Sequence, residues 1–201
     1  PVIASNFGGA NAAISVAENT KAVTTVRAAD QDAGAAITYS ITGGADAARF
    51  AINSTTGALS FVAAPNFEAP GDVGANNVYD VIVRAGDGVF IDDQALAVRV
   101  TNVNEFAPVL TSNGGGASAA ISIAENTAAA TTVSATDQDA DKRISYSIVG
   151  GADKDRFLIN FETGALAFNL SPNAPNFEAP GDVGANNVYD VIVRASDGTF
   201  F

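Results

Sequence analysis

The stretch Asn102-Val103-Asn104-Glu105-Phe106-Ala107-Pro108 lies between two copies of one sequence pattern, and the organisation of the chain follows from it. It carries side-chain oxygens at Asn102, Asn104 and Glu105. Acidic residues recur at matching places in the two copies, where they could face this stretch. The sequence therefore predicts a linker that binds cations and fixes one module rigidly against the next.

The internal repeat sets the domain organisation. ISVAENT at Ile14–Thr20 returns as ISIAENT at Ile121–Thr127. After a short insertion, Ala64–Ala85 matches Ala174–Ala195 without one change over 22 residues. A chain of 201 residues suits two domains. We predict one repeat over residues 1–107, ending in the linker 102–108, and a second over residues 108–201.

Alternating hydrophobicity predicts strands within each repeat. In Val78–Arg84, Tyr79, Val81 and Val83 fall on one face, which is typical of a strand with one buried side. The other strands expected in the first repeat are Ile14–Ala17, Ala22–Ala28, Ile37–Thr42, Ala58–Val62 and Gln94–Thr101. Glycine-containing turns such as Gly43-Gly44 and Thr56-Gly57 separate them, and Ala45–Phe50 could form one helical turn. About seven strands per repeat predict an all-β fold of two tandem Greek-key, immunoglobulin-like β-sandwiches.

Composition limits the partners and the chemistry. The net charge of −12 excludes nucleic acid as a partner, because binding to phosphates needs a basic surface, and disfavours an anionic membrane surface. The absence of Cys excludes disulfides, and no apolar run is long enough for direct membrane insertion. Oxygen ligands without His or Cys favour calcium or magnesium over zinc, copper or iron. A segment that directs export would lie outside this sequence.

Several short motifs in one order carry a family resemblance, and all of them except the linker recur in the second copy. They are Ala17-Glu18-Asn19, Asp30-Gln31-Asp32, Asn66-Phe67-Glu68, Ala85-Gly86-Asp87 and the linker itself. The chain resembles tandem cadherin repeats of the bacterial kind over almost its whole length. The resemblance implies an extracellular, cell-surface or secreted protein in which calcium binds between repeats, not within one.

The resemblance also implies the ligands. Glu18 and Glu68 would supply carboxylates from the first repeat, and the second repeat would supply Asp137, Asp139 and Asp197, with the main-chain carbonyl of Asp141. The linker would supply Asn102, Asn104 and Glu105 with the carbonyls of Val103 and Phe106. Calcium takes six to eight oxygens in irregular geometry, which suits such a scattered set, and two to three ions are expected. Without cations the carboxylates would repel one another, so the ion-free junction should be flexible.

The chain departs from the usual family linker, Asp-x-Asn-Asp-Asn-x-Pro. Asn102 replaces the first Asp, Glu105 the second Asp and Phe106 the last Asn, while Asn66 replaces the Asp of the mid-repeat motif. Two formal charges are therefore missing, at Asn66 and Asn102. We expect weaker binding than at a full site, near the roughly 10⁻⁴–10⁻³ M of extracellular calcium modules.

Both ends of the sequence predict incomplete elements. Glu125 and Glu178 repeat Glu18 and Glu68, and Asp30, Asp32 and Asp87 have no linker before them, so these half-sites should bind poorly. Phe201 aligns with Ile91, so the last strand of the second repeat is expected to be missing. Its absence would leave an exposed edge that invites pairing with a neighbouring chain.

The sequence supports an enzymatic function less well than a calcium-binding adhesion module. Asp-x-Asp occurs in glycosyltransferases, paired carboxylates in glycosidases, and Gly114-Gly115-Gly116 could suggest a phosphate loop, but the supporting patterns of each are missing. No His or Cys is present for Ser-His or Cys-His catalysis, so we expect no enzyme. Three functions stay open: a calcium-rigidified spacer in an adhesin array, homophilic adhesion between chains, and binding of surface polysaccharide through exposed aromatics. The candidate aromatics are Phe7, Phe90, Phe200 and Phe201.

Overall fold

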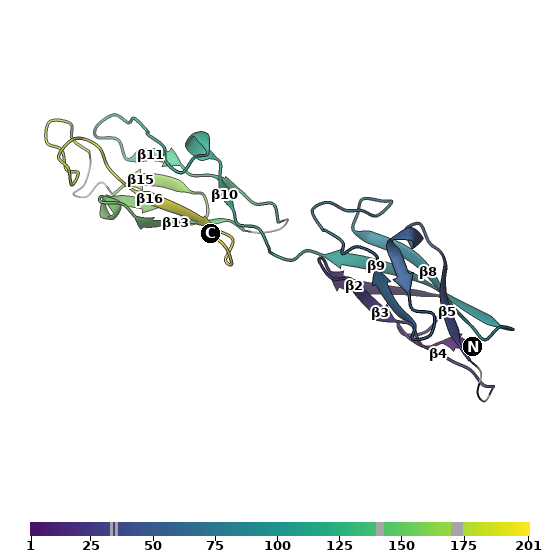
Figure 1. Ribbon diagram of the computed structural model, residues 1–201. Coiled ribbons are helices and arrows are strands. Elements are labelled where there is room, and N and C mark those ends of the chain that lie inside the picture. The colour runs from purple at the N-terminus through teal and green to yellow at the C-terminus, as the bar shows by residue number, and fades with distance from the viewer. Residues whose placement is uncertain (33, 35, 140–142, 170–174) are drawn as a thin grey trace. The chain divides into compact units, whose positions relative to one another are not determined.

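The structure is a computed structural model that describes residues 1–32, 34, 36–139, 143–169 and 175–201. The chain divides into two compact units, Pro1–Val103 and Asn104–Phe201. Each unit is built from short strands joined by turns, without an α-helix among the described residues (Figure 1). No helix in the described ranges is both long enough and apolar enough to span a membrane.

The first unit contains two main sheets. Its elements are β1 (Val2–Ile3), β2 (Asn11–Ala17), β3 (Ala22–Thr25), β4 (Ala28–Ala29), β5 (Thr38–Gly43), η1 (Ala47–Arg49), β6 (Phe50–Ile52), β7 (Ala58–Phe61), β8 (Val78–Gly86) and β9 (Ile91–Thr101). The larger sheet has the strand order β2-β9-β8-β5, and the smaller one β3-β7-β6. Strand β2 runs parallel to β9, whereas β8 runs antiparallel to both of its neighbours.

The core lies between these sheets and follows the alternation in the sequence. In β8, Tyr79, Val81 and Val83 are at most 3% exposed, and β9 contributes the equally buried Leu96 and Val98. Each such side chain contributes about 1.5–3 kcal/mol by leaving water. The smaller sheet adds the buried aromatic rings of Phe50 and Phe61, which complete the core from the opposite side.

The second unit repeats this arrangement in part. Its elements are β10 (Val109–Leu110), η2 (Ser112–Gly114), β11 (Ala129–Thr132), β12 (Ala135–Thr136), β13 (Ser145–Gly150), η3 (Lys154–Arg156), β14 (Phe157–Ile159), β15 (Ala165–Phe168) and β16 (Ile192–Ser196). The sheet β11-β15-β14 corresponds to β3-β7-β6, and the pair β13-β16 to β5-β8. The described residues hold no counterpart of β9, and Tyr189, Val191 and Val193 are only partly buried, unlike their counterparts in β8.

The predicted all-β tandem sandwich is confirmed, with changes in detail. The strand predicted at Ala22–Ala28 is divided into β3 and β4, because the chain leaves the sheet at Val26 and Arg27. Strands β1 and β6 were not predicted, since two or three residues are too few to show a periodicity. The first unit therefore has more strands than the expected seven or so. The helical turn expected in Ala45–Phe50 is the 3₁₀ turn η1.

Candidate metal centre

Glu18 is a buried carboxylate at the end of β2. Its side chain is only 2% exposed, and its backbone N–H donates to the carbonyl of Thr101, which fixes it beside the end of β9. The Phe67 N–H donates to Glu18 Oε2 at 2.7 Å, and the Val103 N–H donates to Oε1 at 2.8 Å. Each oxygen accepts one backbone hydrogen bond and keeps further lone-pair capacity, so Glu18 can serve both the backbone and a cation.

Glu68 lies on a long loop between β7 and β8 that buried carboxylates hold in place. Asp46, only 4% exposed, accepts from the N–H groups of Val73 and Asp80 at 2.8 and 2.9 Å. Asp72 accepts from the N–H groups that follow it, at Asn76 and Asn77. In the second unit, Asp153 and Asp182 make the same sets of hydrogen bonds. The loop that presents Glu68 is thus fixed by polar contacts inside its own repeat.

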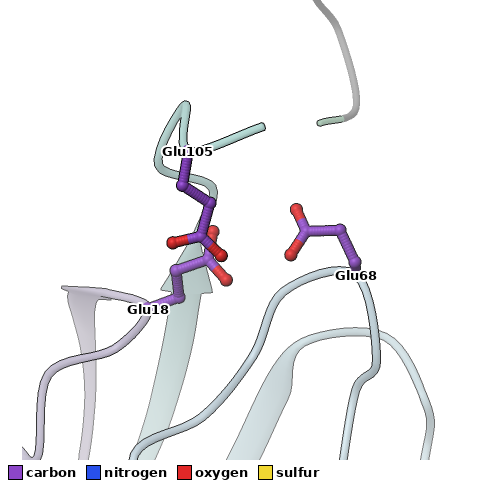
Figure 2. A group of neighbouring side chains, drawn as sticks. All are labelled: Glu18, Glu68 and Glu105. Carbon is purple, nitrogen blue, oxygen red and sulfur yellow. The ribbon is translucent and has the colours of Figure 1, made fainter. Parts of the chain in front are cut away.

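Glu18, Glu68 and the linker residue Glu105 form the first carboxylate group. One carboxylate oxygen from each lies within 4.8 Å of the others. Figure 2 shows the three side chains directed toward a common space, Glu18 from the end of β2, Glu68 from its loop and Glu105 from the linker. Three negative charges at this separation repel one another. A divalent cation among them would attract all three carboxylates and make the net electrostatic interaction of the group favourable.

Asp139 holds the linker in the second unit. It is 3% exposed, and its Oδ2 accepts from the N–H groups of Glu105 and Phe106 at 3.1 and 2.8 Å. Its own N–H donates to Asp137 Oδ1 at 3.0 Å, which joins the two residues of the Asp-x-Asp motif in one tight turn. The motif and the linker are therefore in direct contact.

Buried oxygens without hydrogen-bond donors gather around this contact. Within the described ranges, Asn104 Oδ1, Asp137 Oδ2, Asp139 Oδ1 and Asp197 Oδ2 are buried and accept no hydrogen bond. An orphaned buried acceptor costs about 1–3 kcal/mol, and more if it is charged. Such oxygens in a native site are explained by an ion or by ordered water. Calcium, which binds carboxylate and carbonyl oxygens, fits this donor set.

Asp197 is adapted to remain ionised. Although burial acts to raise its pKa, the N–H groups of Phe200 and Thr199, at 2.7 and 2.6 Å, and the nearby Asn104 side chain lower the pKa below its usual value. The negative form that a cation requires is thus stabilised before any cation binds.

Asp30, Asp32 and Asp87 form a second carboxylate group in the first unit, also within 4.8 Å. These residues are the counterparts of Asp137, Asp139 and Asp197. Within this group, the Phe90 N–H donates to Asp87 Oδ1 at 2.7 Å and lowers the pKa of Asp87.

The structure brings some of the residues expected to bind metal together and leaves others apart. Glu18, Glu68 and Glu105 are brought together, whereas within the described ranges Asp137, Asp139 and Asp197 do not offer three oxygens that all lie within 4.8 Å of one another. Asn102 has a buried side-chain oxygen, and Asp141 lies outside the described residues. Sequence reasoning assigned roles to the carbonyls of Val103 and Phe106 but missed that their N–H groups bind Glu18 and Asp139. It also missed the supports Asp46 and Asp72, although both recur unchanged as Asp153 and Asp182.

Comparison with known proteins agrees with this fold. No family model matches the chain. Among curated proteins, the mouse Cadherin EGF LAG seven-pass G-type receptor 2 is 34% identical over 149 residues, which cover 72% of this chain and 5% of the receptor. Human Protocadherin Fat 1 is 30% identical over 198 residues, covering 92% of this chain and 4% of that protein. The chain thus spans about one twentieth of the length of these relatives.

Solved structures that match the chain have the cadherin fold as well. The Drosophila N-cadherin EC1-4 structure matches with a TM-score of 0.65 and 26% identity, covering 91% of this chain and 42% of that one. The human Desmocollin-1 ectodomain matches with a TM-score of 0.69 at 18% identity, covering 96% and 37% of the two chains, which supports the fold alone. The chain consists of tandem cadherin-like repeats, a class that the sandwich fold and the ordered acidic motifs define together.

Proposed function

We propose that the linker and the acidic residues around it bind calcium, and that the bound ions stiffen the connection between two repeats of a cell-adhesion protein. The observation that carries this proposal is the set of buried oxygens without hydrogen-bond donors at Asn104, Asp137, Asp139 and Asp197. The converging carboxylates of Glu18, Glu68 and Glu105 support it. The main-chain carbonyls of Val103 and Phe106 and the side chain of Asn102 complete the proposed set.

Charge balance sets the number of ions. The proposed ligands include six carboxylates: Glu18, Glu68, Glu105, Asp137, Asp139 and Asp197. Two to three calcium ions would neutralise most or all of their charge, and without ions the repulsion would favour separation of the repeats. The Asn at positions 66 and 102 leaves two charges fewer than the full family pattern, which favours an affinity near about 10⁻⁴–10⁻³ M.

Isothermal titration calorimetry tests the proposal. Calcium titrated into the EDTA-stripped chain should release or absorb heat with two to three equivalents bound, and Asp139→Asn should weaken binding at least about tenfold, because it removes a charge from the site. Asp32→Asn makes the same change in the counterpart motif, which does not contact residues 102–108, and should leave the main binding phase unchanged. An absence of calcium binding by the unaltered chain at millimolar calcium would refute the proposal.

The same proposal gives the chain a mechanical role. We assign it to a rod-like spacer of an extracellular array, in which repeats 1–107 and 108–201 are consecutive members and neighbouring repeats are the immediate partners. The identity of Ala64–Ala85 and Ala174–Ala195, which includes exposed positions such as Val73 and Val183, favours equivalent joints over one unique site. The parent protein would be a bacterial surface or secreted adhesin, although the relatives compared above are animal proteins.

A second candidate function rests on Phe7. This side chain is fully exposed at 103%, and its φ of 70° lies in the left-handed region that disfavours side chains. The equivalent residue in the second unit is Gly114, with φ 91° in a loop of the same form. Folding of the loop therefore requires no aromatic ring at this position, and a ring presented at a conformational cost suits contact with a partner, such as a polysaccharide or a second chain.

A polysaccharide pull-down and a sedimentation experiment distinguish these partners. If Phe7 binds polysaccharide, Phe7→Gly should abolish retention on the polysaccharide while calcium binding remains. If it contacts a second copy, the same substitution should remove a dimer seen by analytical ultracentrifugation. A chain that is monomeric and binds no polysaccharide would leave only the spacer role.

A further inference from the structure

The backbone N–H groups of the linker assign Glu18 and Asp139 a role that needs no metal ion. Val103 N–H donates to Glu18 inside the first unit, and the N–H groups of Glu105 and Phe106 donate to Asp139 inside the second. We propose that these two carboxylates are linker clamps. They hold the linker backbone onto its own unit before any cation binds, and they confine the pivot of the ion-free chain to Val103–Asn104.

The repeat provides an internal comparison for the first clamp. Glu125, the counterpart of Glu18, accepts the equivalent loop hydrogen bond from Phe177 N–H at 3.0 Å. Its side chain is nevertheless exposed, whereas that of Glu18 is 2% exposed. The loop contact alone therefore does not bury this carboxylate. Glu18 has two further neighbours, the end of β9 and the Val103 N–H, and neither has a counterpart beside Glu125 among the described residues.

The second clamp shows the same difference. Asp32 N–H donates to Asp30 Oδ1 at 2.9 Å, as Asp139 N–H donates to Asp137 Oδ1 at 3.0 Å, so the two Asp-x-Asp turns have the same form. Asp32 is exposed, and Asp139 is 3% exposed. The turn itself does not require a buried second Asp. The burial of Asp139 goes together with its contact with the linker N–H groups.

The two carboxylate oxygens of Asp139 have different environments. Oδ2 accepts both linker hydrogen bonds, while Oδ1 is buried and accepts none within the described part of the chain. A cation can bind Oδ1 without displacing the linker, so the clamp and the proposed calcium site are compatible. This compatibility rests on the proposed function, but the clamp does not, because hydrogen bonds to a charged acceptor are strong in themselves.

The clamps also locate the pivot. The clamped N–H groups of Val103 and Glu105 leave one residue between them, Asn104, and the boundary between the compact units falls between Val103 and Asn104. Ion-free motion of the linker should therefore concentrate in the torsions of these two residues, rather than spread over the whole of residues 102–108.

Amide hydrogen exchange measured by NMR in EDTA tests the clamps. The N–H groups of Val103, Glu105 and Phe106 should exchange about ten to a hundred times more slowly than unprotected amides, as expected for hydrogen bonds to charged acceptors, and Asn104 should exchange fast. Core amides such as Val81 report that the protein is folded. Unprotected exchange at Glu105 and Phe106, with the core still protected, would overturn the proposal.

Matched variants separate the clamp from the metal site. Asp139→Ala should remove protection at Glu105 and Phe106, whereas Asp139→Asn keeps an acceptor oxygen without the charge and should retain part of the protection. Asp32→Ala is the control and should change neither. If the unaltered chain binds no calcium but its linker amides are protected in EDTA, the proposed function fails and the clamp stands. If calcium binds but protection in EDTA is absent, the clamp fails and the function stands.

Discussion

Gly44 packs directly against the backbone of Asp80, so closely that a Cβ at position 44 would overlap the Asp80 carbonyl oxygen. Its φ of +103° is also strained for any other residue. Gly151 repeats the relationship with Asp190 in the second unit. This contact brings the turn after β5 against β8 and lets Asp46, two residues later, reach the mid-repeat loop.

Gly44→Ala should therefore destabilise the first unit strongly. Overlap with backbone and a disfavoured φ together should cost at least about 2 kcal/mol, measured by thermal or urea unfolding. Gly88→Ala is the control, since Gly88 has a similar φ of +95° but open space around its Cβ. It should cost only about 1 kcal/mol. Equal losses for the two variants would show that close packing at Gly44 is unimportant.

The aromatic core gives a second prediction. Phe61 is 2% exposed, stacks on Phe50 at 4.6 Å between ring centroids and meets Tyr79 edge-on at 5.1 Å. Phe61→Ala should lower the free energy of unfolding by about 3–5 kcal/mol through the cavity that it leaves. Phe7→Ala deletes the same ring at a fully exposed position and should not destabilise the chain. A small effect of Phe61→Ala would contradict the core assignment.

Acid should weaken the turn that Asp87 organises. The N–H groups of Phe90 and Val89 lower the pKa of Asp87 below its ordinary value of 3.8. A carboxylate with a lowered folded-state pKa stabilises the fold above pH 3.8, and this contribution is lost as pH falls through the folded-state pKa. Asp87→Asn keeps the acceptor oxygen but not the charge.

The free energy of unfolding of the unaltered chain and of the Asp87→Asn variant is measured from about pH 6 down to about pH 2. The unaltered chain should be the more stable at about pH 6, and its advantage should disappear well below pH 3.8, where Asp87 is protonated in both states. Asp93→Asn serves as a comparison, because Asp93 owes its lowered pKa to Arg84 at 2.7 Å on the sheet surface. An advantage that stays constant down to about pH 2 would contradict the role given to the Asp87 charge.

The sequence predicted the parts of the fold that depend on periodicity and repetition. The alternation in Val78–Arg84 identified the buried face of β8, and Tyr79, Val81 and Val83 are buried as expected. Strands β1 and β6 are too short to carry a pattern and were missed. The division of Ala22–Ala28 was also missed, because it depends on tertiary contacts of Val26, whose N–H donates to the carbonyl of Gly57.

For the candidate site, the order of motifs brought Glu18, Glu68 and Glu105 into one hypothesis, and the structure places them together. The hydrogen bonds from linker N–H groups could not be predicted, since every residue except Pro has an N–H and no side-chain pattern marks the ones that bind. The role of Glu18, Glu68 and Glu105 as calcium ligands stays a prediction.

Small-angle X-ray scattering of the 201-residue chain, in EDTA and in millimolar calcium, tests the central claim most directly. The calcium-bound chain should show a larger maximum dimension and one extended shape, with a higher melting temperature, since a ligand that binds only the folded state stabilises it. Asp139→Asn should reduce both responses to calcium. Identical scattering and melting with and without calcium would show that the acidic residues are ordinary loop charges, and calcium-dependent stiffening would be excluded.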